Sequence, residues 1–319
     1  MSTSGGTKAI LAALGANLGI AIAKFVGFII SNSPSMLAES VHSLADTSNQ
    51  ALLLLGGRKS RKKADATHPF GFGRERYVYA FVVSIILFSI GGVFSLYEGI
   101  DKIQHPHELE NAIVPIVILI VAIGLETFSF RTAIVESNHV RGKQGWIAFI
   151  RHSKAPELPV VLLEDFAALI GLVLALTGVS LSVVTGDPVF DAIGTICIGV
   201  LLVLVAIVLG IETKSLLVGE GASPADAEKI RDAINDHKDV EALIHMKTLY
   251  LGPDELLVGA KVAFARTKKL ADVAASINAL ETTIREAVPV ARVIYIEPDV
   301  YVAKGATPAT DAIVIKAAD

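Results

Sequence analysis

The residues with the clearest chemistry are His42 and Asp46, which stand four positions apart in a largely apolar stretch. Positions i and i+4 share one face of an α-helix, so the imidazole and the carboxylate would point the same way. One nitrogen and one oxygen ligand on one face form half of a tetrahedral site suited to zinc. Asn49 and Gln50 add polar groups at neighbouring positions. The alternative is that His42 and Asp46 hydrogen-bond each other and serve helix packing.

A second pair of candidates, Glu164 and Asp165, opens another apolar stretch. Two adjacent carboxylates there would repel each other unless a cation or a proton lay between them, and a metal–proton exchanger needs that property. The alternative is an acidic pair that faces water at the end of a helix. Glu126 lies in a further apolar stretch, and it could either reach this site or bond to another helix.

The elements that hold these residues are predicted to span a membrane. The chain has 319 residues, of which 52% are hydrophobic and 19% charged. Residues 1–219 hold 32 of its 60 charged residues, and the much shorter segment 220–319 holds the other 28. A bilayer span needs about 20 apolar residues. Six stretches meet this length, near residues 8–31, 35–57, 77–99, 112–135, 160–184 and 190–212.

Basic residues between these stretches predict the orientation. Lys and Arg accumulate in the loops after the second and fourth stretches, whereas the loops of the opposite side carry only Lys102. Because Lys and Arg favour cytoplasmic loops, both termini are expected to face the cytoplasm or its topological equivalent. We therefore expect a multi-pass protein of a bacterial inner membrane or an organelle membrane.

The last hundred residues have the composition of a soluble domain. Ser223 is a predicted N-cap and Pro224 a first helical residue. Periodicity predicts an α-β-β-α-β order, with segments at 223–237, 244–250, 256–264, 270–287 and 292–296. Two helices on a three-stranded sheet indicate a small ferredoxin-like α+β domain.

The whole chain is thus expected to be an α-helical membrane protein with a small appended domain. Its expected parts are a six-span transport domain at 1–214, a cytoplasmic domain at 215–302 and a tail at 303–319. The net charge of −4 makes nucleic acid an improbable partner. A single cysteine, Cys197, excludes both a disulfide framework and a Cys-based zinc site.

Three motifs resemble those of the cation diffusion facilitator family. They are AESVHSLADTSNQ at residues 38–50, HPFGFGR at 68–74 and VLLEDFAA at 161–168. The last is similar to the zinc transporter nine-like branch. The resemblance covers the chain to about residue 300. It implies that this protein is a homodimeric metal–proton antiporter with six spans and a cytoplasmic ferredoxin-like domain.

The resemblance also implies a ligand set. His42, Asp46 and Asp165 match three of four family positions, but the fourth is Val161. Glu164, Glu126 or a water molecule would then complete the metal site, or the preferred metal would differ. Glu126 and Asn49 are candidates for an accessory or proton-coupling role.

Two further sites of the family are incomplete in this chain. In the loop after the second stretch, Asp65 and His68 match two ligands, but Phe72 occupies the third position. This second site is expected to be weak, and the preferred interpretation is that His68 and the turn at Gly71 and Gly73 dock the loop. In the last hundred residues His245 matches one ligand position, but Lys261, Tyr295 and Glu297 stand where other ligands would be expected, so this domain is interpreted as a dimerisation module.

The sequence therefore predicts a transporter and not an enzyme. We expect it to export a divalent cation from the cytoplasm by metal–proton antiport, with Zn²⁺ the first candidate and no organic cofactor. Because ligand type alone does not determine the metal, Mn²⁺, Fe²⁺ or Co²⁺ are alternatives. A membrane metal sensor or adaptor without transport is a second hypothesis, motivated by Val161. A metal-dependent hydrolase is a remote third, since no two-histidine metalloprotease motif occurs.

Overall fold

A computed structural model describes residues 4–31, 34–106 and 113–300, without the side chains of 4, 5, 31, 34–39, 41 and 42. The chain divides into two compact units. The first comprises residues 1–220 together with Leu251–Asp254, and the second comprises Gly221–Tyr250 and the residues from Glu255 onward. The predicted tail at 303–319 lies outside the described residues.

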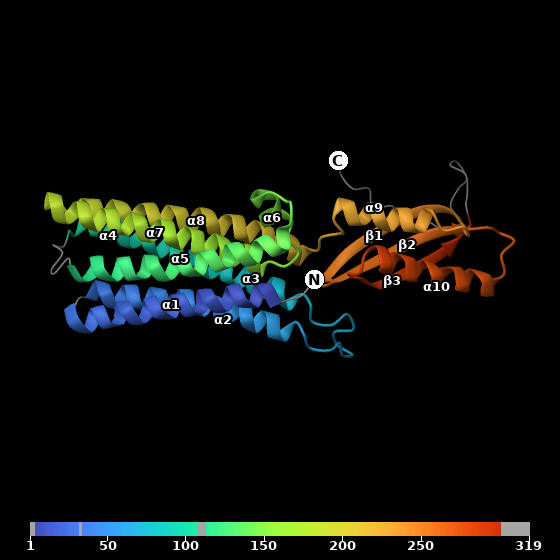
Figure 1. Ribbon diagram of the computed structural model, residues 1–319, viewed down its shortest axis with the longest axis horizontal. Coiled ribbons are helices and arrows are strands. Elements are labelled where there is room, and N and C mark those ends of the chain that lie inside the picture. The colour runs from blue at the N-terminus through green and yellow to red at the C-terminus, as the bar shows by residue number, and fades with distance from the viewer. Residues whose placement is uncertain (1–3, 32–33, 107–112, 301–319) are drawn as a thin grey trace. The chain divides into compact units, whose positions relative to one another are not determined.

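The first unit is a bundle of long helices that run side by side (Figure 1). Its elements are α1 (Ser4–Ser31), α2 (Pro34–Lys59), α3 (Glu75–Ile86), the π-helical η1 (Leu87–Val93), α4 (Phe94–Gln104), α5 (Ile113–Arg141), the short α6 (Trp146–His152), α7 (Glu157–Thr185) and α8 (Val189–Val218).

Among the described residues, five continuous helices are long and apolar enough to cross a bilayer: α1, the run α3–η1–α4, α5, α7 and α8. The prediction of a multi-pass membrane protein is thus confirmed. The remaining predicted span is α2, which has 26 residues but carries serine, asparagine, glutamine and charged side chains along its length. These polar residues set α2 apart from the five apolar helices, so the sixth span stays a prediction.

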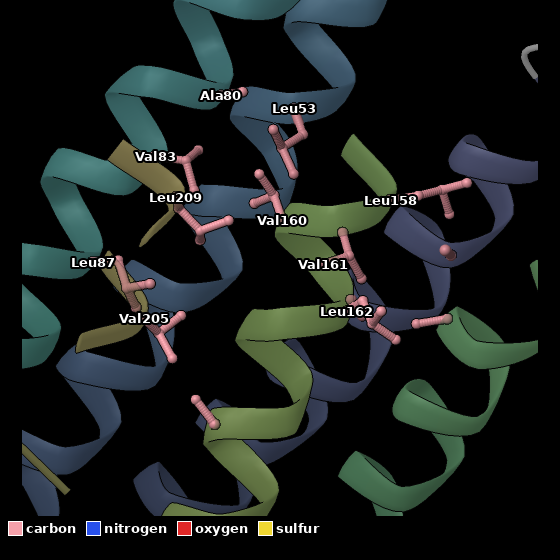
Figure 2. Packing of buried hydrophobic residues seen from close by; sticks show 14 of the residues in the cluster. Leu53, Ala80, Val83, Leu87, Leu158, Val160, Val161, Leu162, Val205 and Leu209 are labelled. Carbon is pink, nitrogen blue, oxygen red and sulfur yellow. The ribbon is translucent and has the colours of Figure 1, made fainter. Parts of the chain in front are cut away.

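A shared apolar core holds the bundle together. Helix α1 packs on α2 and α5, α7 lies against both α5 and α8, and α3 and α4 pack on α8. Figure 2 shows side chains of α7 meeting those of neighbouring helices in this core. Val161 is fully buried there. The position that departs from the family's ligand pattern is thus part of the hydrophobic core.

The second unit has the predicted α-β-β-α-β order. Its elements are α9 (Pro224–Asn235), β1 (Val240–Gly252), β2 (Glu255–Phe264), α10 (Leu270–Ala287) and β3 (Ala291–Asp299). The strand order is β1-β2-β3, and β2 is parallel to β3. Ser223 is the N-cap of α9, because its hydroxyl accepts a hydrogen bond from the Asp226 backbone N–H at 3.1 Å. Both helices bury apolar side chains against the sheet.

Candidate metal centre

The predicted site residues lie on three helices of the bundle. His42, Asp46 and Asn49 belong to α2, Glu126 to α5, and Glu164 and Asp165 to α7. His42 lies within α2, but its side chain is outside the described part of the structure. Asp46 is partly buried, and Asn49, Glu126, Glu164 and Asp165 are buried.

Glu164 joins α7 to α2 through two side-chain amides. Asn49 Nδ2 donates to Glu164 Oε1 at 2.9 Å, and Gln50 Nε2 donates to Glu164 Oε2 at 2.9 Å. Gln50 in turn accepts a hydrogen bond at its Oε1 from Asn17 Nδ2 of α1, at 3.2 Å. Each Glu164 oxygen therefore has a donor. Since burial penalises a charged carboxylate without hydrogen bonds, these amides compensate part of that cost.

Asp165 joins α7 to α5. Its Oδ2 accepts a hydrogen bond from Ser129 Oγ at 2.6 Å. Ser129 itself is fully buried. Sequence reasoning did not include Ser129, because a single serine in an apolar helix gives no signal of its partner. The bond holds the Oδ2 atom of this carboxylate in place.

Glu126 is buried beside these carboxylates. Its Oε1 has no hydrogen-bond partner within the described ranges. The carboxylates of Asp46, Glu126, Glu164 and Asp165 are near enough to interact electrostatically. Like charges in a low-dielectric interior repel strongly, so such a group favours a bound cation or a proton. The structure thus brings the predicted acidic residues of α2, α5 and α7 together.

The acidic side chains alone do not form a complete ligand shell. No group of three His, Cys, Asp or Glu side chains suited to a metal ion occurs among the described residues. A complete site would therefore need donors beyond that set, such as His42, an amide oxygen or water.

The second predicted site lies in the loop between α2 and α3, and it is exposed. The Asp65 Oδ1 atom accepts the backbone N–H groups of Thr67 and His68 at 2.9 and 2.7 Å. His68 Nδ1 lies 3.3 Å from the same oxygen, and the His68 ring contacts Phe72 with ring centroids 4.4 Å apart. The backbone bond from His68 also lowers the pKa of Asp65. These contacts organise a turn, and a metal role for Asp65 and His68 stays a prediction.

The C-terminal positions that resemble family ligands carry other contacts. His245 is exposed on β1. Lys261 Nζ lies 3.0 Å from Glu297 Oε1 and 3.1 Å from Asp299 Oδ2. Because a lysine ammonium has no acceptor atom, this position forms an ion pair and does not ligate a cation.

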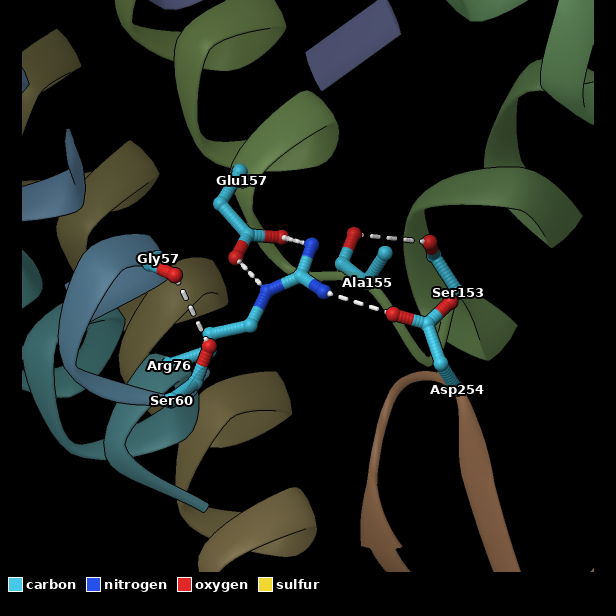
Figure 3. Close-up of polar contacts among 7 residues, drawn as sticks. All are labelled: Gly57, Ser60, Arg76, Ser153, Ala155, Glu157 and Asp254. Carbon is cyan, nitrogen blue, oxygen red and sulfur yellow. Dashed lines mark hydrogen bonds and ion pairs between the residues drawn. The ribbon is translucent and has the colours of Figure 1, made fainter. Parts of the chain in front are cut away.

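Sequence reasoning missed a buried ion pair at the first turns of α3 and α7. Arg76 binds both carboxylate oxygens of Glu157, with Nη2 2.8 Å from Oε2 and Nε bonded to Oε1 (Figure 3). Its Nη1 also lies 3.3 Å from Oδ2 of Asp254, a residue that groups with the bundle. The sequence alone shows Arg76 as one of several basic residues after the second apolar stretch, since a partner 81 positions away leaves no local pattern.

Comparisons with known proteins show which proteins this chain is similar to. Residues 10–218 match the model of the cation efflux transmembrane domain. The chain is 32% identical over 243 residues to the mouse protein named proton-coupled zinc antiporter SLC30A9, mitochondrial, a match that covers 76% of this chain and 43% of that protein. It is 29% identical over 259 residues to metal tolerance protein C4 of Arabidopsis thaliana, covering 81% of this chain and 57% of that protein.

A third relative is the magnetosome protein MamB of Magnetospira, 25% identical over 70% of both chains. The alignments span less than half the length of the mouse protein and little more than half of the Arabidopsis protein.

Proposed function

Because this chain belongs to the cation efflux family, we propose that it exports Zn²⁺ from the cytoplasm in exchange for protons. One observation carries the proposal: α2, α5 and α7 place the partly buried Asp46 and the buried Glu126, Glu164 and Asp165 within electrostatic range of one another. Such a cluster is costly without a counter-ion, and intramembrane carboxylates of this kind serve ion pathways.

His42, Asp46 and Asp165 are the proposed ligands, and Glu164 and Glu126 are the proposed supporting carboxylates. His42 and Asp46 share one face of α2, and Asp165 comes from α7. The hydrogen bond from Ser129 orients the Asp165 carboxylate, as outer hydrogen bonds do for metal ligands. The Asp65–His68 loop site keeps a minor role in this proposal.

Exchange follows from competition at one site. Imidazole and carboxylate bind a metal only when deprotonated, so a proton and a cation compete for the same groups. Protons that arrive from the far side would displace the metal, and metal that arrives from the cytoplasm would displace protons. Alternation of the bundle between two open states would complete the cycle.

The oxygen-rich donor set supports a second candidate, a transporter of the same family that prefers Mn²⁺, Fe²⁺ or Co²⁺. Carboxylates suit harder cations, and this chain has valine where a fourth ligand is expected. We also propose a homodimer with both termini in the cytoplasm.

Flux measurements on purified protein in proteoliposomes test the proposal. Uptake of Zn²⁺, Mn²⁺, Fe²⁺ and Co²⁺ would be measured together with proton movement reported by a dye. We expect Asp46→Asn and Asp165→Asn each to reduce metal-driven proton flux at least tenfold, because each removes a ligand charge. Glu98→Gln is the matched control, since Glu98 lies in the α3–η1–α4 span and pairs with Lys102. Full flux in both aspartate variants would contradict the proposal, and binding without flux in the unaltered protein would favour the sensor hypothesis.

A further inference from the structure

We propose that Asn49 supplies the ligand that the family pattern lacks at Val161. Its side-chain carbonyl oxygen would coordinate the transported cation, and Glu164 would be the positioning residue that orients the amide. The inference rests on the proposed function, because it adds one ligand to the same site.

The hydrogen bond to Glu164 determines which way the Asn49 amide faces. A carboxylate only accepts hydrogen bonds, and a side-chain amide has one donor end and one acceptor end. Asn49 must therefore present its NH₂ group to Glu164, as the 2.9 Å bond from Nδ2 to Oε1 records. The carbonyl oxygen is consequently directed away from Glu164.

That carbonyl oxygen is buried and unsatisfied. Asn49 Oδ1 is inaccessible to solvent, and no donor in the described segments reaches it. Buried polar atoms normally have a hydrogen-bond partner, so a buried oxygen atom without one needs an explanation. A cation satisfies a carbonyl oxygen without needing a hydrogen-bond donor nearby, and carbonyl oxygens are ordinary ligands of divalent cations.

The position of Asn49 on α2 places this oxygen with the proposed ligands. His42, Asp46 and Asn49 are spaced i, i+4 and i+7 in a continuous helix. This spacing forms a single stripe along one face. Asn49 also bonds to Glu164, the immediate neighbour of the proposed ligand Asp165. One imidazole nitrogen, two carboxylates and one amide oxygen would then make four donors.

Gln50 provides an internal comparison. It is buried, and it donates to the other oxygen of Glu164 at the same 2.9 Å distance. Its own carbonyl oxygen, however, accepts a hydrogen bond from Asn17. Both ends of the Gln50 amide are thus used by the protein, whereas the acceptor end of Asn49 is open.

The first experiment compares Asn49→Leu with Gln50→Leu in the purified full-length protein. Zn²⁺ alone is titrated by calorimetry at fixed pH, and thermal stability is measured in parallel. Each variant removes one donor from Glu164, and Gln50→Leu also removes the acceptor of Asn17, so we expect Gln50→Leu to lose at least as much stability as Asn49→Leu. Only Asn49→Leu removes the open oxygen, so we expect it alone to raise the Kd for Zn²⁺ by at least about tenfold. Equal Kd changes in both variants would overturn the inference.

The second experiment replaces the oxygen with a softer ligand. Asn49→Cys and Gln50→Cys are compared in a Cys197→Ser background, which removes the single native thiol. A coordinating thiolate favours a soft metal, so only Asn49→Cys should gain Cd²⁺ affinity relative to Zn²⁺ and show thiolate-to-metal absorbance on Cd²⁺ addition. The absence of both signals would overturn the inference.

Asp46→Asn and Asp165→Asn separate this inference from the proposed function. If these two variants retain Zn²⁺ binding, the site itself is misplaced. If they lose it while Asn49→Leu binds Zn²⁺ as tightly as the unaltered protein, the site stands and only the role of Asn49 is wrong.

Discussion

Single residues of this bundle depend on partners from distant parts of the chain. The Arg76 and Glu157 side chains are only 12% and 4% exposed, and they form a bidentate pair between the first turns of α3 and α7. The guanidinium geometry matches both carboxylate oxygens at once. Such a pair contributes little net stability compared with apolar packing, but the loss of Glu157 would leave the Arg76 guanidinium with the half-exposed Asp254 as its remaining partner.

We predict that Glu157→Gln destabilises the bundle by about 1–3 kcal/mol, because the Arg76 guanidinium loses its bidentate partner but keeps Asp254, whose side chain is 46% exposed. Glu212→Gln is the matched control, because its partner Arg151 is 67% exposed and 3.6 Å away. Exposed pairs contribute about 0–1 kcal/mol. Thermal unfolding in detergent would compare the two variants, and equal shifts of the midpoint would contradict the prediction.

At the scale of elements, glycines set how closely α4 and α8 approach. A Cβ atom on Gly99 would lie 2.9 Å from the Ile196 backbone nitrogen, and one on Gly199 would lie 2.8 Å from that of Leu96. Backbone atoms cannot rotate out of the way, so these contacts require glycine. The π-helical η1 precedes α4, and its Gly91 and Gly92 are buried against the same helix α8.

Gly199→Ala is therefore predicted to destabilise the bundle by about 1–3 kcal/mol, because overpacking displaces a helix. The control is Gly124→Ala on α5, where a Cβ meets nothing within 4 Å. There the change should be neutral or stabilise by at most about 1 kcal/mol through helix propensity. Detergent unfolding of both variants is the measurement, and a loss of stability at Gly124 matching that at Gly199 would refute the packing explanation.

At the scale of the whole molecule, a helical membrane unit is followed by an α-β-β-α-β unit. The basic residues near α2 and α6 predict that the loops there share a side with the second unit. The same side is predicted for the start of α1 only if α2 also crosses the membrane, and its polar residues set α2 apart from the apolar helices. The side on which the start of α1 lies is therefore the test of that sixth span.

Cysteine labelling measures this orientation. In a Cys197→Ser background, Lys8→Cys and Thr67→Cys should react with a membrane-impermeant maleimide from one side, and Asp187→Cys from the other. All three positions are exposed in the structure. If α2 does not cross the membrane, Lys8 and Thr67 would react from opposite sides.

The secondary structure of this protein and its acidic candidate residues can be predicted from local sequence patterns. Runs of apolar residues determined the five apolar helices, and alternation and capping determined the α-β-β-α-β order of the second unit. The acidic candidates stood out because a carboxylate in an apolar helix is costly wherever that helix packs. These features depend on neighbours within a few positions, so no tertiary contact is needed to predict them.

Only the tertiary structure decided which partners these residues meet. Glu164 bonds to Asn49 across 115 positions, Asp165 to Ser129 across 36, and Arg76 to Glu157 across 81. Helical periodicity defines a face of each helix, but it does not define how two helices are rotated toward each other. That rotation emerges from the shared apolar core, and it places one amide oxygen of Asn49 in the interior without a partner among the described residues.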